Sequence, residues 1–116
     1  MDKTYLKNAA IVSVFDYKDF EKIHLADVLT GSVIEDETLR FRAFQQIVTS
    51  KIVTRHIKGE KSEVITHSGS CYVIDDNPEF FELTLAEFVV MRTGAYSPKR
   101  IIEMRDILKQ LNKNQH

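Results

Sequence analysis

The sequence predicts an α+β fold, in which a curled antiparallel sheet or small partly open barrel of about five strands packs against two C-terminal helices. Segments rich in β-branched residues extend to about residue 75, a Ser68-Gly69 pair within them indicates a hairpin, and helix-start signals follow from residue 84. With 116 residues, 43% of them hydrophobic, the chain is expected to form a single domain over 1–116, strand-rich over 9–75 and helical over 79–112.

The first two elements expected are a buried strand and a short helix. Residues 9–15 are apolar and rich in β-branched types, which favours a strand. Asp16 is a suitable N-cap for a helix in which Tyr17, Phe20 and either Ile23 or His24 share one face. A short helix is therefore predicted directly after the first strand.

A second strand is expected over residues 27–35, with a bulge or a close backbone approach at Gly31. The segment 39–58 that follows allows two interpretations. Its apolar residues include one helical face, but its second half is dominated by β-branched residues, which prefer a pleated sheet. We favour two strands, or one bent strand broken near Thr49-Ser50.

The region from residue 44 to residue 75 is predicted to form an antiparallel meander. Residues 62–67 and 71–75 have strand composition, and Ser68-Gly69 between them is typical of a two-residue hairpin turn. Lys58–Lys61 supplies the turn before them. The strands are therefore joined by short connections.

Two helices are predicted at the C-terminal end. Thr84 and Glu87 form a capping box that begins a helix over residues 85–93. This helix is apolar almost all round and is expected to be buried. Ser97-Pro98 then begins a second helix. The second helix is amphipathic, with an apolar stripe of Ile101, Met104, Leu108 and Leu111.

Charged residues are arranged in four blocks of alternating sign. Residues 1–38 hold eight acids and four bases, and residues 39–62 hold six bases and one acid. Residues 63–90 hold six acids and no Lys or Arg, and residues 91–116 hold six bases and two acids. The net charge of −1 conceals this pattern, which predicts a basic face and an acidic face and so concerns partners rather than fold.

No residue pattern typical of catalysis or metal binding is present in the sequence. His56, His67 and Cys71 lack the spacing of a zinc site, and Cys71 beside His67 resembles a catalytic pair in composition only. There is no Gly-x-Ser-x-Gly motif and no glycine-rich phosphate loop. We therefore expect a protein that is not an enzyme and has no metal and no cofactor.

The single cysteine, the absence of a secretory signal and the shortness of every apolar run favour a cytoplasmic protein that does not bind a membrane. Such a protein could bind another protein through complementary charge. The acidic residues predicted to form the contact face for a basic partner are Glu35, Asp36, Glu37, Asp75, Asp76, Glu79 and Glu82. Phe80, Phe81 and Tyr96 have no evident place in a small core and are candidates for the apolar centre of an interface.

The alternative is a small barrel that binds nucleic acid through the basic segment 40–61. Basic side chains would contact phosphates while Phe41 and Phe44 stack on bases. The basic residues of this alternative site are Arg40, Arg42, Lys51, Arg55 and Lys58. The two acidic blocks and the pI near 6.4 make nucleic acid the second choice of partner.

Four segments of the chain form a recognisable pattern: GSVIED at 31–36, RF at 40–41, IVTSKI at 47–52 and THSGSCY at 66–72. This pattern resembles a family of small uncharacterised proteobacterial proteins that are often encoded in prophage-like or accessory regions. The chain departs from the family pattern at Ala43-Phe44-Gln45, where a glycine turn is expected. The family has no activity to carry over, but accessory-region proteins of this size are often inhibitors or immunity proteins. The resemblance therefore favours a non-enzymatic protein that binds another protein stoichiometrically, as a monomer or a homodimer.

Overall fold

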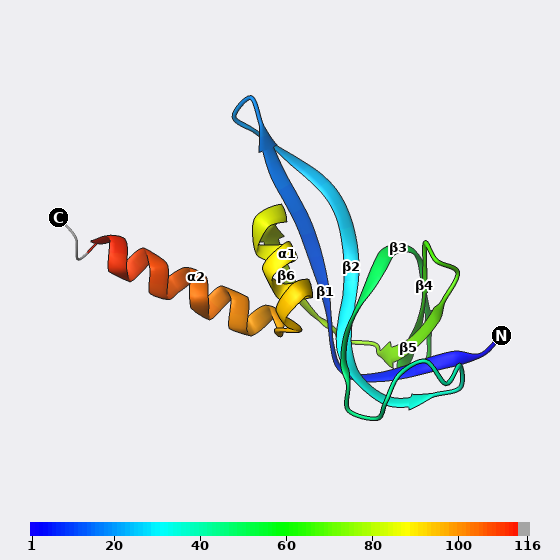
Figure 1. The fold of residues 1–116 in the computed structure, drawn as a ribbon. Helices are drawn as coiled ribbons and strands as arrows, with labels where there is room; N and C mark the ends of the chain where they lie inside the picture. Colours follow the sequence, from blue (N-terminus) through cyan, green and yellow to red (C-terminus); the bar gives the residue numbers. More distant parts are fainter. Residues whose placement is uncertain (114–116) are drawn as a thin grey trace.

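The structure, a computed structural model, describes residues 1–113 and consists of a six-stranded mixed sheet with two C-terminal helices (Figure 1). The elements are β1 (Lys3–Lys18), β2 (Glu21–Asp36), β3 (Gln46–Lys58), β4 (Lys61–Thr66), β5 (Cys71–Asp75), β6 (Glu79–Thr84), α1 (Leu85–Gly94) and α2 (Pro98–Lys113). The predicted α+β class and the two C-terminal helices are confirmed. The sheet differs from the prediction because it has six strands and includes parallel pairs.

Strand β1 organises the sheet by pairing with three other strands. It runs antiparallel to β2 along its whole length, parallel to β5 through Lys3–Tyr5, and parallel to β6 through Ala10–Phe15. The strand order β2-β3-β4-β5-β1-β6, with the additional β1–β2 pairing, closes β1 to β5 into a ring of five strands. The first part of β1 therefore closes the ring, and its second part carries β6 and the helices.

The helix predicted after Asp16 is wrong, because β1 continues and turns into β2. The turn residues Asp19 and Phe20 both have positive φ, 52° and 69°. Two successive residues of this kind match the twist of the flanking strands in a tight hairpin. Residues 16–23 pair in the sheet only with each other and project from the body of the molecule (Figure 1); we call them the hairpin arm.

The predicted close approach at Gly31 is confirmed. A Cβ atom at this position would lie 3.1 Å from Leu6 Cβ and 3.3 Å from the carbonyl oxygen of Lys7. On the facing strand the register shifts between Lys7 and Ala10, and Asn8 has a φ of 52°. The bulge and the glycine together allow β1 and β2 to bend from the hairpin arm into the ring.

The ambiguous segment 39–58 forms a loop over residues 37–45 and then the single strand β3. Its pairing with β2 shifts in register at Thr49-Ser50, where the break was predicted, and its pairing with β4 shifts between Ile52 and Thr54. Of the two alternatives, the single irregular strand is therefore the one observed. Strands β4 and β5 complete the predicted antiparallel meander. The connection at Ser68-Gly69 spans residues 67–70 and is therefore longer than the predicted two-residue turn.

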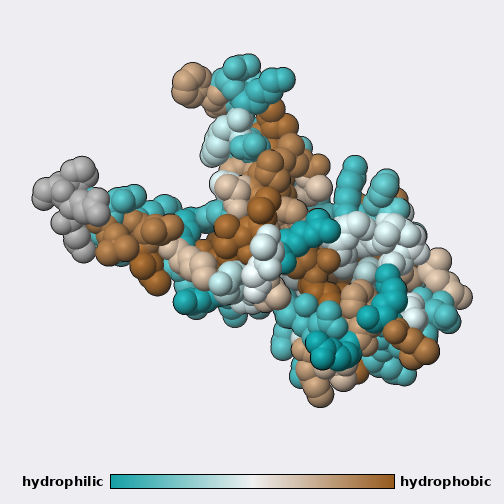
Figure 2. All heavy atoms as spheres, in the orientation of Figure 1, coloured by the Kyte–Doolittle hydropathy of each residue, from teal (hydrophilic) through white to brown (hydrophobic). Residues whose placement is uncertain are grey.

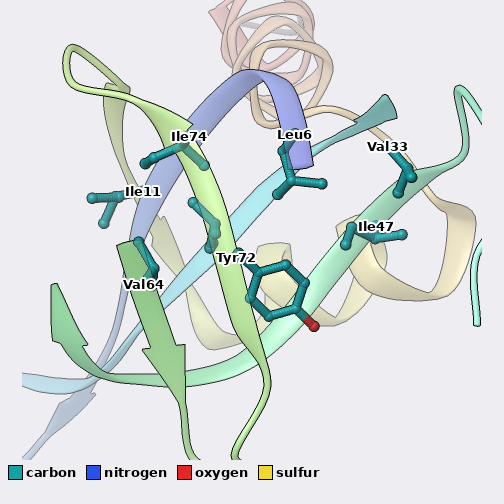
Figure 3. Packing of buried hydrophobic residues seen from close by; sticks show 8 residues of the cluster. Leu6, Ile11, Val33, Ile47, Val64, Tyr72 and Ile74 are labelled. Carbon is teal, nitrogen blue, oxygen red and sulfur yellow. The ribbon is translucent and has the colours of Figure 1, made fainter. Parts of the chain in front are cut away.

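The hydrophobic core is divided between the ring and the helices. Figure 3 shows the first cluster, in which side chains from all five strands of the ring point toward one another. Its buried members are Leu6, Ile11, Leu29, Val33, Ile47, Val64, Tyr72 and Ile74. The second cluster joins the sheet to α1 and α2 through Val12, Val14, Val28, Leu83, Met91 and Ile101. The helices are therefore attached to the sheet by their own part of the core.

The capping box of α1 is confirmed, but the burial predicted for this helix is wrong. The Glu87 amide donates to Thr84 Oγ1 at 3.1 Å, and the Thr84 amide donates to Glu87 Oε1 at 2.9 Å. Only Met91 of α1 is buried. Helix α1 packs on one side of the sheet and nothing in the described residues covers its other side, which leaves Leu85, Val89 and Val90 between 40% and 52% exposed.

The amphipathic character of α2 is confirmed, although only its first half packs against the protein. Ser97 Oγ accepts the Arg100 amide at the helix start, and Ile101 is buried. The second half projects away from the sheet (Figure 1), so Leu108 and Leu111 are 61% and 52% exposed. Neither helix of the described region has the length and apolar content that a membrane crossing requires.

Candidate protein-binding surface

The acidic residues predicted to form a contact face are mostly engaged by groups of the protein itself. Four of them form ion pairs: Asp75 with Lys61, Asp76 with Arg55, Glu79 with Lys99, and Glu82 with Lys22. Glu37 accepts the backbone amide of Lys3 at 2.8 Å. Glu35, on β2 opposite Tyr5, is exposed. These acids are therefore distributed over separate local contacts.

Asp36 has a structural role at the start of the loop 37–45. Its carboxylate accepts hydrogen bonds from the Thr4 and Thr38 hydroxyls and from the amides of Thr38, Arg40 and Phe41. Desolvation by itself would raise the pKa of Asp36, but these hydrogen bonds outweigh it and hold the pKa well below its usual value. A carboxylate occupied in this way is a poor contact group for a partner.

The basic residues of the nucleic-acid alternative divide into two groups. Arg55 donates to the backbone carbonyl of Asp76, and Lys58 pairs with Glu63 at 2.8 Å. Lys3 also pairs with Glu63, and the hydrogen bonds from Lys3 and then Lys58 lower the pKa of Glu63 to about 2. These cations are therefore neutralised within the sheet.

The second group lies in the loop 37–45 and on the strand β3 that follows it. The Arg40 guanidinium donates to Ser70 Oγ at 3.0 Å and lies over the Phe41 ring, 4.8 Å from its centroid. Arg42 and Lys51 form no ion pair within residues 1–113. The structure thus leaves part of the predicted basic site available to an anion.

Apolar side chains that lack partners gather on the helices. Figure 2 shows them along the hairpin arm, over α1 and along the outer half of α2, on one face of the molecule that is hollowed between the arm and α2. We call the exposed apolar residues of the two helices the α1–α2 face; they are Leu85, Val89, Val90, Ile107, Leu108 and Leu111. Exposed apolar side chains gathered in this way are typical of a binding site for another protein.

A shallow apolar groove runs between the two helices. Its volume is about 210 Å³, and its apolar lining comes from Ala86, Val90, Ile101, Met104 and Leu108. The groove therefore contains both buried core residues and exposed members of the α1–α2 face. An apolar side chain of a partner could enter it without meeting an unpaired polar group.

An ion pair fixes the angle between α1 and α2 beside this groove. The Arg105 guanidinium donates to both Glu87 carboxylate oxygens at 2.7 Å, and also donates to the carbonyl oxygen of Glu82. The hydrogen bonds from Arg105 lower the pKa of Glu87, and those to Glu87 raise the pKa of Arg105. Because Glu87 also completes the cap of α1, one carboxylate both starts the first helix and positions the second.

The aromatic residues that lacked a place in the predicted core have different environments. Phe80 is 66% exposed on β6, whereas Phe81 packs against the second core cluster. Tyr96 lies between the helices and remains partly exposed. Sequence reasoning correctly identified Phe80 as exposed apolar surface, but it missed Leu85, Val89 and Val90 because a continuous apolar helix resembles a buried one.

Cys71 and His67 have different environments. Cys71 is buried at the start of β5, and burial is the main cause that raises the pKa of its thiol. His67 lies exposed in the preceding loop, and no hydrogen bond joins it to Cys71 in the described region. Within residues 1–113, no three His, Cys, Asp or Glu side chains lie close enough together to hold a metal ion.

Comparisons with family models, curated proteins and solved structures give no match to this chain.

Proposed function

We propose that this protein is a non-enzymatic binding factor that engages another protein stoichiometrically through the α1–α2 face, in the manner of an inhibitor or immunity protein. The observation that carries the proposal is the exposure of about half of each of Val89, Val90 and Leu111, with Leu108 exposed even more. Burying this apolar surface against a partner is favourable. The groove beside it offers a site for an anchoring side chain.

The proposed contact surface lies on the helices rather than on the acidic residues predicted from the sequence. An acid that is already paired must lose its partner or be desolvated together with it before it can contribute to binding. Asp75, Asp76, Glu79 and Glu82 are in that position. They are therefore better suited to the polar rim of an interface, where charge steers a basic partner.

The test compares two variants of nearly equal exposure. Leu108→Glu places a charge on the α1–α2 face, and Ile57→Glu places one on β3. The two side chains are nearly equally exposed, 61% for Leu108 and 63% for Ile57. We expect the wild-type chain and Ile57→Glu to capture a partner from the native host, and we expect Leu108→Glu to lose it. It should then bind purified wild-type chain in a fixed stoichiometric ratio, measured by calorimetry.

Both variants should first give wild-type circular dichroism and unfolding curves. A partner that binds Leu108→Glu as well as the wild type would contradict the proposed surface. If the partner is lost only when the charges of Asp75 and Asp76 are reversed, the acidic residues form the contact instead.

A second candidate function is nucleic-acid binding at the loop 37–45. The specific observation is that Lys7 lies over the Phe44 ring, 4.9 Å from its centroid. Arg42, two residues before Phe44, forms no ion pair within residues 1–113. Phe44 is itself exposed. Such an arrangement supplies both a cation and a stacking surface for single-stranded nucleic acid.

Retention on heparin or immobilised single-stranded DNA tests this candidate. Retention at low salt should fall steeply as salt rises, and Arg42→Glu with Lys51→Glu should abolish it. Lys18→Glu with Arg92→Glu, on the hairpin arm and on α1, is the matched control, because it also reverses two positive charges. Absence of retention by the wild-type chain at low salt would exclude the candidate.

A further inference from the structure

We propose that the loops 37–45 and 67–70 form, together with β3, a binding site for a phosphoryl group. The site consists of the Arg40 guanidinium and of hydroxyl groups from β3 and from the loop 67–70. Its ligand is a free phosphate ion or the phosphate of a small monoester. None of the site residues belongs to the α1–α2 face, so the inference goes beyond the proposed function and does not depend on it.

Four hydroxyl groups lie together where β4 is connected to β5. Ser68 Oγ is at their centre, 3.2 Å from Thr66 Oγ1 and 3.3 Å from each of Ser50 Oγ and Ser70 Oγ. The Ser68 amide also donates to Ser50 Oγ at 3.2 Å, which holds the loop 67–70 against β3. We call Ser50, Thr66, Ser68 and Ser70 the hydroxyl cluster.

The hydroxyl cluster has a proton to donate. Its four O–H groups make three contacts with one another, and each contact uses one proton. At least one O–H group therefore has no acceptor inside the cluster, and the hydrogen bonds within residues 1–113 give it no other acceptor. A bound anion would accept this proton in a charge-assisted hydrogen bond, which is stronger than a neutral one.

Arg40 adds a positive charge in a fixed orientation beside the cluster. Its Nε donates to Thr38 Oγ1 at 2.9 Å, its Nη1 donates to Ser70 Oγ at 3.0 Å, and the guanidinium lies over the Phe41 ring. The guanidinium forms no ion pair within residues 1–113. Because a guanidinium has five N–H donors and two are used here, three remain for a ligand.

The segments that carry the site lack acidic residues. Residues 38–59 and 64–74 contain no Asp or Glu. Asp36 is connected to the Arg40 guanidinium through the Thr38 hydroxyl, but its oxygens already accept five hydrogen bonds. The positive charge of Arg40 is therefore available to a bound anion.

A phosphoryl group matches this set of donors. A guanidinium can donate to two oxygens of a phosphate at once, in the fork geometry that distinguishes arginine from lysine. A phosphate then has further oxygens for hydroxyl protons, whereas both oxygens of a carboxylate would already be occupied. One oriented guanidinium beside a group of hydroxyls therefore favours a phosphate over a carboxylate.

Titration of the full chain with inorganic phosphate and with glycerol 3-phosphate, followed by NMR at constant ionic strength and pH 7, tests the proposal. The amide signals of Ser68 and Ser70 and the Arg40 Nε–H signal should shift and saturate. Arg40→Gln should raise the Kd by about tenfold or more, because charge-assisted hydrogen bonds are lost. Arg42→Gln is the matched control, since it removes the same charge from the same loop, and it should change the Kd by less than about twofold.

A second variant separates binding from structure, because Arg40 also links the loop 37–45 to the loop 67–70. Ser68→Ala removes the central hydroxyl and leaves Arg40 in place. It should raise the Kd by about threefold to tenfold, while the amide signals of β3 and β5 remain close to those of the wild type. Ser13→Ala, which removes a hydroxyl from β1 outside the site, should leave the Kd unchanged.

Saturable binding of inorganic phosphate alone would support a site for the free ion, and binding of glycerol 3-phosphate as well would support a site that is open to monoesters. Shifts that do not saturate, or that Arg42→Gln weakens as much as Arg40→Gln does, would overturn the inference. It would also fail if single-stranded DNA bound and neither small ligand did, because the cations would then serve the nucleic-acid candidate.

Discussion

Asp36 illustrates how one carboxylate can fix a whole connection. It accepts five hydrogen bonds, which tie Thr4 of β1 to the backbone of residues 38–41. The loop 37–45 needs this support because Leu39 and Phe44 both have positive φ, 62° and 65°, a conformation that bulky residues rarely adopt. From the sequence Asp36 was assigned to an acidic contact face, because a run of three acids is usually a solvated turn and nothing local indicates which acid accepts the hydrogen bonds.

Replacing Asp36 with Ala should destabilise the protein by about 2–4 kcal/mol, since several charge-assisted hydrogen bonds are lost and their donors are left without an acceptor. Glu35→Ala is the matched control, because Glu35 is exposed and its side chain makes no hydrogen bond within residues 1–113. Urea unfolding of the two variants gives the comparison. Equal midpoints for both would show that Asp36 does not hold the loop.

Glu63 should make stability depend on pH in the acid range. Its pKa is lowered from 4.5 to about 2 in the folded chain by Lys3 and Lys58. A lowered pKa means that the unfolded chain takes up the proton first as pH falls, so the stabilisation is complete above about 4.5 and is lost towards 2.

The melting temperature of Glu63→Gln should therefore fall less than that of the wild type as the pH is lowered across this window. Glu60→Gln, in the adjacent turn, controls for the loss of one negative charge. Parallel curves for the wild type and Glu63→Gln would contradict the assigned role.

At the scale of elements, the predictions were correct for features that depend only on residues close together in the chain. The capping box of α1, the Ser97-Pro98 start of α2 and the turn before β4 all depend on neighbours within a few residues. Strand β6 was missed because its partner is β1, about seventy residues earlier in the chain, and no local pattern indicates a parallel pair. The hairpin arm was predicted as a helix because Tyr17, Phe20 and Ile23 have helical spacing. In the structure Asp19 and Phe20 both have positive φ, which forms a turn instead.

The charge pattern did not indicate which charged side chains pair within the fold, for a related reason. Charge blocks along the chain suggested separate acidic and basic faces, but antiparallel pairing places Lys58 beside Glu63 and Lys61 beside Asp75. The exposed side of α1 was not foreseen because the sequence does not reveal how many layers cover a helix. Residue types identified the apolar and charged groups, and only the topology shows which of them remain without partners.

Gly31→Ala tests the close approach of β1 and β2 at this position. The added methyl group would meet Leu6 Cβ at 3.1 Å and the Lys7 carbonyl oxygen at 3.3 Å, so one strand must move. We expect a loss of about 1–3 kcal/mol in the free energy of unfolding. Ser32→Ala, at the next position, should change it by only about 0.5 kcal/mol. A neutral Gly31→Ala variant would indicate that β1 and β2 adjust freely at this point.

The whole molecule is a ring of strands with two projections, the hairpin arm and the outer half of α2, and it measures 55 × 30 × 25 Å. The core clusters lie in the ring and beneath the helices and include no residue of the arm. The two projections therefore contribute surface rather than stability.

Shortening the hairpin arm tests this division. Asp16 and Ile23 are paired, so replacing residues 17–22 with Asn-Gly retains the register and closes a two-residue turn. The free energy of unfolding should change by no more than about 1 kcal/mol, since only surface contacts such as the Lys22–Glu82 pair are lost. A large loss of stability in urea would show that the arm belongs to the cooperative core.

The closure of the ring through β1 also sets the order in which the chain can fold during its synthesis. Strand β1 is translated first, but β5 and β6, with which it pairs in parallel, end at residues 75 and 84. At roughly 5–20 residues per second, the ribosome needs several seconds to produce these partners after β1 is complete. During that interval β1 has only β2 to pair with, as a hairpin. The apolar residues that later fill the ring are then exposed, so the newly made chain depends on protection from premature contacts until its last strand is translated.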